Sequence, residues 1–100
     1  MFVIGRFRVK GSSMEPLYPA GSFMLCIALP VRKGDVVIVE KNGRRMLKRV
    51  QGLPGTRING KILSKGYYYV LGYNPDSSTD SRSFGAVHRK EILGKAFRLT

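Results

Sequence analysis

The sequence has 100 residues, of which 43% are apolar, so it can form one domain with a core and is too apolar for a disordered chain. Eighteen Lys and Arg residues against six Asp and Glu residues give a net charge of +12, which suggests a polyanionic partner or an acidic membrane surface. The basic residues form no block longer than two, and no helix-turn-helix, zinc-finger or RNP-type pattern occurs. We therefore do not expect nucleic acid to be the main partner.

Short apolar runs separated by Gly and Pro predict an all-β fold, with residues 1–100 as a single domain. The first strand is expected to change phase near Gly5, and Pro16 and Pro19 indicate a loop over Gly11–Gly21. The expected strands are, in chain order, Met1–Val9, Ser22–Leu29, Asp35–Glu40, Arg45–Val50, Thr56–Ile58, Lys61–Leu63, Tyr67–Leu71 and Ala96–Leu99.

Two dipeptides predict tight hairpins, because Asn-Gly favours the positive φ angles of a two-residue turn. Asn42-Gly43 joins the third and fourth expected strands, and Asn59-Gly60 joins the fifth and sixth. A long polar loop is expected over Gly72–Phe84, and His88–Leu93 is expected to form one helical turn. No other helix is indicated.

The single cysteine, Cys26, lies in the apolar run Phe23–Leu29, so no internal disulfide can form and a reducing compartment is the simpler expectation. We interpret Cys26 as a buried structural thiol. The run has seven residues, whereas a membrane-spanning helix needs about 20. Met1–Val9 also lacks the apolar segment of a signal peptide. We expect a cytoplasmic protein, with peripheral contact to an anionic membrane as the alternative.

Two segments carry candidate catalytic groups. Ser13 lies in a loop between Gly11 and Pro16, where its hydroxyl and nearby backbone N–H groups can face a ligand, although serine-rich loops are common. In a strand, Lys48 shares a face with Met46 and Val50, so burial would lower its pKa and favour the neutral amine. The alternative is an edge-strand lysine whose ammonium group reaches water.

The chain resembles the signal peptidase I family of serine–lysine peptidases in four motifs, which occur in the family's order. They are Ser13-Met14-Glu15-Pro16, Gly34-Asp35 before Val36–Val39, Lys48-Arg49 followed by Gly52-Leu53-Pro54-Gly55, and Gly72–Asn74 with Ser78-Thr79-Asp80-Ser81-Arg82. Together they cover most of the chain. The resemblance implies a coiled β-sheet or partial barrel of short strands with hairpins, a fold that the self-cleaving repressor domains share.

The resemblance also implies the roles of individual residues. Ser13 corresponds to the nucleophile, whose backbone N–H helps to bind the oxyanion, and Lys48 corresponds to the general base. Ser78 corresponds to a serine that orients the lysine, while Asp80 and Arg82 correspond to a pair that braces the site. No metal or other cofactor is implied. The second oxyanion donor is left open, since a glycine, at position 11, stands where some relatives carry a hydroxyl.

Other departures narrow the expected substrate. Tyr73 stands where the last motif usually has Asp, Gly21-Ser22 where Gly-Asp is common, and the family's membrane anchor and large inserted domain have no counterpart in the sequence. These features, with Asn74-Pro75 and Ser78–Gly85, resemble the nickel-type superoxide dismutase maturation proteases. The implied partner is a precursor protein from which a short N-terminal extension is removed. The alternatives are a signal peptidase I acting on secretory precursors at a membrane and a basic, non-enzymatic nucleic-acid-binding module.

Overall fold

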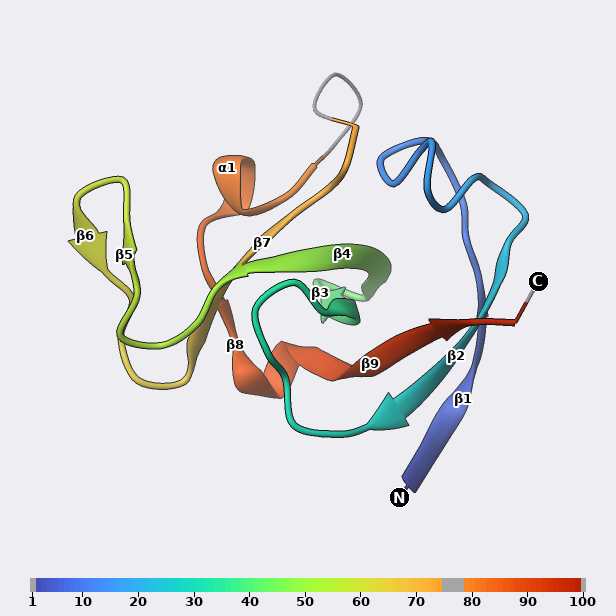
Figure 1. Ribbon diagram of the computed structural model, residues 1–100, viewed down its shortest axis with the longest axis horizontal. Helices are drawn as coiled ribbons and strands as arrows, with labels where there is room; N and C mark the ends of the chain where they lie inside the picture. The colour runs from blue at the N-terminus through green and yellow to red at the C-terminus, as the bar shows by residue number, and fades with distance from the viewer. Residues whose placement is uncertain (1, 75–78, 100) are drawn as a thin grey trace.

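The computed structural model describes residues 2–74 and 79–99 of the chain. Within these residues, seven strands form one antiparallel sheet in the order β1-β2-β9-β3-β4-β7-β8, which confirms the predicted all-β class (Figure 1). The strands of this sheet are β1 (Phe2–Arg8), β2 (Phe23–Ala28), β3 (Val36–Lys41), β4 (Arg44–Gly52), β7 (Tyr67–Leu71), β8 (Val87–His88) and β9 (Ile92–Arg98). The remaining pair, β5 (Arg57–Ile58) and β6 (Lys61–Ile62), forms a separate hairpin.

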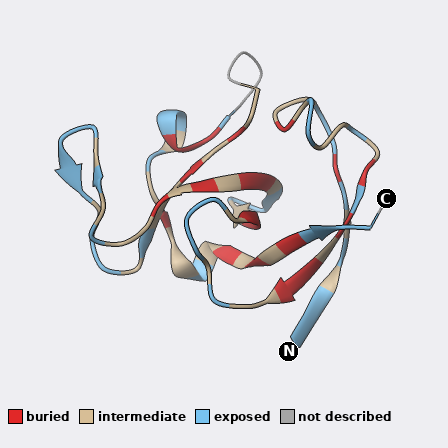
Figure 2. Ribbon diagram, in the orientation of Figure 1, coloured by how far each residue is buried: buried red, intermediate tan, exposed pale blue. Residues whose placement is uncertain are grey.

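Strand β3 is buried on both faces, which explains its continuous run of valine and isoleucine. Val36 and Ile38 pack into a cluster with residues of β2 and β4, whereas Val37 and Val39 pack into a second cluster with residues of β4, β7 and β9. Many of the buried residues lie along these central strands, and others lie in the loop after β1 and in the segment between β7 and β8 (Figure 2). Cys26 is fully buried in the first cluster, as the sequence predicted, and burial raises the pKa of its thiol.

Both predicted Asn-Gly hairpins are present. Asn42 and Gly43 have φ angles of 52° and 77°, and Asn59 and Gly60 have φ angles of 50° and 82°. These are the left-handed conformations that a two-residue hairpin turn requires. The first turn fixes the register of β3 on β4, in which Val37 pairs with Lys48.

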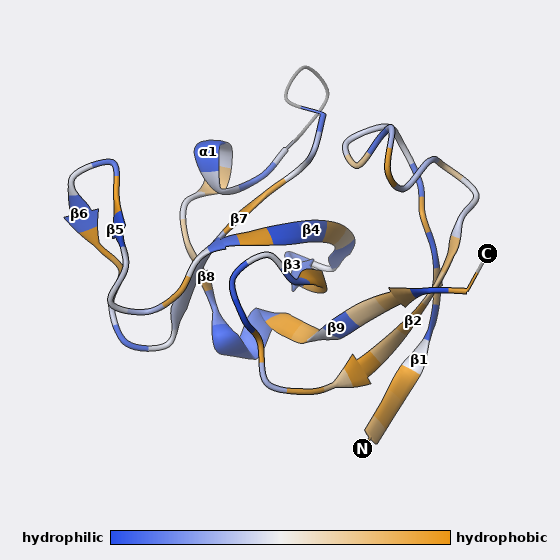
Figure 3. Cartoon of the chain, in the orientation of Figure 1, coloured by the Kyte–Doolittle hydropathy of each residue, from blue (hydrophilic) through white to orange (hydrophobic). Residues whose placement is uncertain are grey.

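The N-terminal strand also follows the prediction, because its register on β2 shifts between Val3 and Gly5. Its first residues are apolar and exposed (Figures 2 and 3). Strand β1 is an edge of the sheet, and the sheet coils so that β1 and the β3–β4 hairpin line opposite sides of one cleft.

The C-terminal part differs from the prediction in three places, one of which is the short strand β8, which was not expected and pairs with β7. The expected loop Gly72–Phe84 ends in a short helix, α1 (Ser81–Phe84), because the Asp80 carboxylate caps it by accepting a hydrogen bond from the Arg82 N–H. The last strand begins at Ile92 instead of Ala96. The early part of this strand was not predicted because Gly94 disfavours a strand. The fold requires a glycine at this position, since a Cβ atom would lie 2.5 Å from the Ile27 carbonyl oxygen.

The helical turn expected at His88–Leu93 is present as a shorter 3₁₀ helix over Arg89–Glu91. His88 Nδ1 accepts a hydrogen bond from the Lys90 N–H, and the Glu91 carboxylate accepts one from the His88 N–H. These two hydrogen bonds form a capping box that stabilises the single helical turn, and β9 begins at the next residue, Ile92.

Candidate active site

Ser13 lies in the loop that connects β1 to β2, here called the Ser13 loop (residues 9–22). Backbone hydrogen bonds between Val9 and Ser22 and between Gly21 and Val9, each 2.8 Å long, close its base. Met14, only 1% exposed, packs into the first core cluster and anchors the loop next to Ser13. The apolar residue that follows the serine therefore fixes where the hydroxyl group points.

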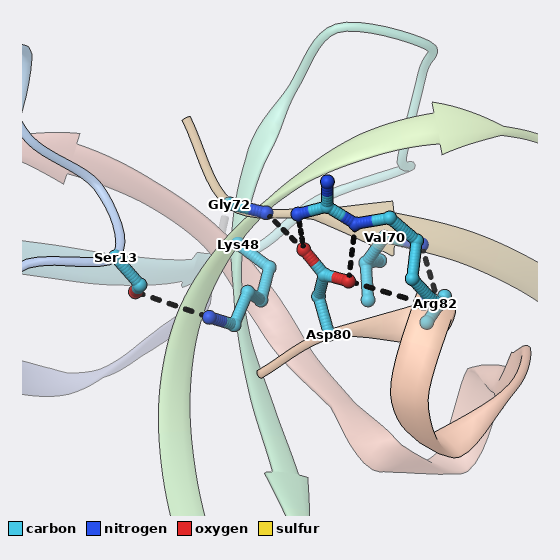
Figure 4. A network of polar contacts seen from close by, with 7 residues as sticks. Ser13, Lys48, Val70, Gly72, Asp80 and Arg82 are labelled. Carbon is cyan, nitrogen blue, oxygen red and sulfur yellow. Dashed lines mark hydrogen bonds and ion pairs between the residues drawn. The ribbon is translucent and has the colours of Figure 1, made fainter. Parts of the chain in front are cut away.

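Lys48 is in the middle of β4 and shares a face with Met46 and Val50, as the sequence predicted. Its side chain is 2% exposed, so it does not reach water, and the alternative of a solvated edge lysine is wrong. Its Nζ atom lies 3.1 Å from Ser13 Oγ, although the two residues are 35 positions apart in sequence (Figure 4). The predicted proximity of the two side chains is thus present in the fold.

The surroundings of Lys48 favour its neutral form. Burial lowers the pKa of the ammonium group, and the positive charges of Arg44 and Arg82 lower it further, whereas the Asp80 carboxylate raises it. Burial is the largest of these effects. A neutral amine beside a serine hydroxyl can take up the hydroxyl proton, which is what a general base must do.

Asp80 and Arg82 form a compact ion pair behind Lys48 (Figure 4). The Asp80 carboxylate is fully buried and accepts hydrogen bonds from Arg82 Nη2 at 2.7 Å, from Arg82 Nε at 3.0 Å and from the Gly72 N–H at 2.9 Å. Because the carboxylate also caps α1, it joins the end of β7 to the helix. These contacts connect β7, α1 and the Arg82 side chain; that the pair braces the active site stays a prediction.

Residue 78, the third supporting residue that the sequence suggested, is outside the described residues. Its neighbours in the motif have defined positions: Thr79 lines the cleft described below, and Ser81 Oγ accepts a hydrogen bond from the Val70 N–H at 2.8 Å. Ser81 therefore attaches α1 to β7.

Asn74 belongs to the last motif, but its role was not predicted from the sequence. Its backbone N–H donates to the Ser13 carbonyl oxygen at 2.8 Å, and its Nδ2 donates to the Ser12 carbonyl oxygen at 3.2 Å. These two bonds orient the peptide groups on both sides of the Ser13 α-carbon, and the Ser12–Ser13 group carries the Ser13 N–H. The asparagine in the Gly-x-Asn pattern was the only available signal.

Tyr73, which departs from the family pattern, also supports this region. The guanidinium carbon of Arg49 lies 5.1 Å from the centre of the Tyr73 ring, and the Tyr18 ring centre lies 6.3 Å away from it. A cation–π contact therefore helps to hold the residue next to Asn74.

A cleft of about 610 Å³ runs from the Ser13–Lys48 pair along the gap between β1 and the β3–β4 hairpin. Its walls are residues 6–14 on one side and residues 43–48 on the other, with Met24, Ile38 and Thr79. Residues 44–48 of β4 pair only with β3, and β1 is an edge strand, so both walls present an unpaired strand edge. In the described part of the chain, no three His, Cys, Asp or Glu side chains gather as metal ligands.

Comparison with known proteins agrees with this geometry. The sequence pattern of the family described as signal peptidase, peptidase S26, matches residues 1–62 and 59–100. The chain therefore belongs to the signal peptidase S26 family, which is a family of serine peptidases.

The chain is similar to signal peptidase I of Bacillus caldolyticus, with 29% identity over 142 aligned positions, covering 95% of this chain and 78% of the relative. It is 32% identical to mitochondrial inner membrane protease subunit 1 of Xenopus tropicalis over 104 positions, which cover 86% of this chain and 62% of that protein. Signal peptidase IB of Staphylococcus aureus is 26% identical over 151 positions, covering 95% and 79%.

Proposed function

We propose that this chain is a serine endopeptidase in which Ser13 is the nucleophile and Lys48 is the general base. The observation that carries the proposal is the 3.1 Å contact between Lys48 Nζ and Ser13 Oγ, made by a lysine that is 2% exposed. A buried amine with a lowered pKa, within hydrogen-bond reach of a serine hydroxyl, is suited to activate that hydroxyl.

In the proposed reaction, the Lys48 amine accepts the proton of the Ser13 hydroxyl while Oγ attacks the carbonyl carbon of the scissile peptide bond. The Ser13 N–H makes no hydrogen bond to another residue that the structure describes, so it is free to donate to the oxyanion. The Lys48 ammonium group then gives its proton to the departing amine, which leaves an ester on Ser13. Water, deprotonated by Lys48, hydrolyses this ester and regenerates both residues.

The cleft suits a peptide in extended conformation. An extended substrate could pair its backbone with the free edge of β1, of β4 at residues 44–48, or of both. Backbone pairing is independent of the substrate's side chains, so side-chain selection would depend on the residues that line the cleft.

The proposed substrate is a precursor protein that carries a short N-terminal extension, and we favour the precursor of a nickel-type superoxide dismutase. The support is the resemblance of residues 72–85 to the proteases that mature this enzyme. Removal of the extension would free the terminal amine and the His-Cys segment that bind nickel. The proposed location is the cytoplasm, where such a precursor would be met.

A single experiment tests both the proposed peptidase activity and the proposed precursor substrate. The purified chain and its Ser13→Ala variant are each incubated with a nickel-type superoxide dismutase precursor, and the new N-terminus is identified by mass spectrometry. We expect one cut by the parent protein and none by the variant. The family resemblance also implies small residues at the first and third positions before the cut, so peptides of this kind are tested alongside. Absence of cleavage of both the precursor and these peptides would reject the peptidase, whereas cleavage of the peptides alone would reject only the precursor.

A second candidate is a signal peptidase that acts on secretory precursors at a membrane surface. Two of the relatives above are named signal peptidase I or IB, and the exposed apolar residues Phe2, Val3 and Ile4 at the start of β1 offer a contact for lipid. The run Phe23–Leu29 does not offer such a contact for lipid, because Met24, Cys26 and Ile27 are buried in the core. Across the described residues, no helix is long and apolar enough to cross a bilayer. Cleavage of a secretory precursor, faster with anionic vesicles, would favour this candidate.

A further inference from the structure

The charged residues that line the cleft are all basic. No Asp or Glu side chain of the described residues lines it. The basic residues are Arg6, Arg8 and Lys10 on the β1 side and Arg44, Arg45 and Lys48 on the β4 side. The overall excess of Lys and Arg in the sequence is thus concentrated, in part, around one concave surface.

These residues are arranged along the length of the cleft. Lys48 is at the Ser13 end, and Arg44 is four residues further along the same face of β4, or about 13 Å away at 3.3 Å per residue. The Arg45 guanidinium carbon lies 5.2 Å from the centre of the Phe7 ring, so this side chain reaches from β4 across to β1. The far end of the cleft is therefore basic.

Most of this charge is not neutralised by the protein. Arg45 forms an exposed ion pair with Glu40 at 2.7 Å. Arg8 stacks over the Phe23 ring at 5.5 Å, a contact that leaves its charge intact. Arg6, Lys10 and Arg44 have no carboxylate partner within the part of the chain that the structure covers. Like charges that line one cleft reinforce each other's potential and attract anionic groups.

We propose that the cleft selects substrates with acidic side chains about three to five residues from the scissile bond. This inference rests on the proposed peptidase function, which defines the scissile bond at Ser13. The spacing follows from the separation of about 13 Å between the Lys48 and Arg44 positions on β4, which an extended peptide spans with about four residues. The acidic residues would all lie on one side of the scissile bond, in the part of the substrate that occupies the cleft between β1 and β4.

The position of the basic groups favours a peptide over a membrane surface or a nucleic acid. The cations line a cleft between two unpaired strand edges, where an extended chain can insert its carboxylates and a lipid surface cannot. The acidic residues are expected away from the cut, since a carboxylate beside Lys48 would favour the ammonium form and oppose its action as a base.

The test uses peptides with small residues around the cut and Glu at the third to fifth positions on one side, then on the other. Matched peptides carry Gln, which has the same shape without the charge. Binding to the Ser13→Ala variant is measured by fluorescence anisotropy, and cleavage is measured with the parent protein. We expect one Glu series to bind about tenfold more tightly than its Gln counterpart, and this preference to fall below about twofold in ~0.5 M salt.

The variant Arg44→Glu/Arg45→Glu, made in the Ser13→Ala background, should lose the preference for Glu and bind Lys-containing peptides better. Lys61→Glu is the control: it removes a cation from β6, which does not line the cleft, and should keep the preference. If the double variant does not fold, Arg44→Gln replaces it, and the peptide comparison on the parent sequence needs no variant at all.

The outcomes separate the inference from the function on which it rests. Tighter binding of Glu peptides without cleavage of any peptide would support the selection of acidic peptides by the cleft and would reject the proposed peptidase function. Cleavage of Glu and Gln peptides with equal kcat/KM and equal affinity would overturn the inference and leave the peptidase intact. Binding of anionic vesicles that depends on Arg44 and Arg45, without any preference among peptides, would also overturn it in favour of a membrane surface.

Discussion

The backbone N–H of Asn74 donates a hydrogen bond to the carbonyl oxygen of Ser13 at 2.8 Å, which ties the end of β7 to the Ser13 loop. The Asn74 side chain adds a second bond, to the Ser12 carbonyl oxygen. The Ser12 carbonyl belongs to the same peptide group as the Ser13 N–H, and the Ser13 carbonyl belongs to the next one. The direction of the Ser13 N–H is therefore set from a segment more than 60 residues away in the sequence.

Asn74→Asp should lower kcat about tenfold while changing KM less than about twofold. The carboxylate keeps the size of the side chain but repels the Ser12 carbonyl oxygen, so the Ser13 N–H is no longer held toward the oxyanion. Asn74→Ala, which only removes the bond, should have a smaller effect. Steady-state kinetics and thermal melts test this prediction. A loss in kcat of the same size in both variants, together with a large fall in Tm, would instead indicate a purely structural role.

Ser13→Ala should reduce kcat about a thousandfold or more and leave the melting temperature unchanged, because one hydroxyl is removed from a loop that Met14 anchors. Ser12→Ala is the control and should keep most of the activity. Rates are measured with a cleavable peptide and melting by circular dichroism. A reversed pattern would mean that the neighbouring serine is the nucleophile.

Lys48→Met should give a folded protein that does not cleave, since methionine fills the space between β4 and the second core cluster without a proton acceptor. Lys48→Arg should be equally inactive, because a guanidinium keeps its proton at every working pH. The comparison needs kcat/KM and melting temperatures for both variants. Cleavage by the Arg variant at near the parent rate would contradict the role of Lys48.

The dependence of activity on pH follows from the lowered pKa of Lys48. Activity requires the neutral amine, so kcat/KM should rise with pH through the folded-state pKa, and this rise should lie below the range of an ordinary lysine. Arg44→Gln removes one of the charges that lower the pKa of Lys48 and should move the rise to higher pH. A profile that is the same in both proteins would show that another group titrates.

Stability should depend on pH through the same residue. With the pKa of Lys48 lower in the folded state, the unfolded state binds more protons between the two pKa values. The free energy of unfolding should therefore rise with pH across that window, and the cost of the buried lysine is greatest below it. Urea unfolding at several pH values checks this, and the rise should be weaker in Lys48→Met.

Asp80→Ala should lower the free energy of unfolding by about 2 kcal/mol, or roughly 10 °C in Tm, because it removes a buried carboxylate that four hydrogen bonds connect to Gly72 and Arg82. Activity should fall as well, since the segment beside Lys48 loosens. Glu40→Ala is the control: its ion pair with Arg45 is exposed and should contribute less than about 1 kcal/mol. Equal effects of the two changes would show that Asp80 does not brace the site.

The sequence predicted the features that depend on local chemistry. The Asn-Gly turns, the buried run of β3 and the face that Lys48 shares with Met46 and Val50 follow from backbone preference and strand alternation. It did not predict α1, β8 or the start of β9. A four-residue helix depends on one capping carboxylate, and Gly94 acts against strand formation unless the close approach of Ile27 is known.

The proximity of Ser13 and Lys48 was expected from the family resemblance and not from the pattern of residues. Strand order determines it, because β1 and β4 face each other only after β2, β9 and β3 have been placed between them. The contacts of Asn74 depend on the same long-range arrangement. The catalytic roles of Ser13, Lys48, Asp80 and Arg82 stay predictions until the variants are measured.

The hairpin formed by β5 and β6 has one more consequence. The two segments that match the family pattern overlap at residues 59–62, the turn and outer arm of this hairpin, while its base is closed by hydrogen bonds of Gly55 and Thr56 with Leu63. The hairpin extends away from the main sheet (Figure 1). A longer insertion at Asn59-Gly60 would leave every strand of that sheet in place. This turn is therefore a position where an additional domain can be inserted, by evolution or by protein engineering, without changes to the cleft.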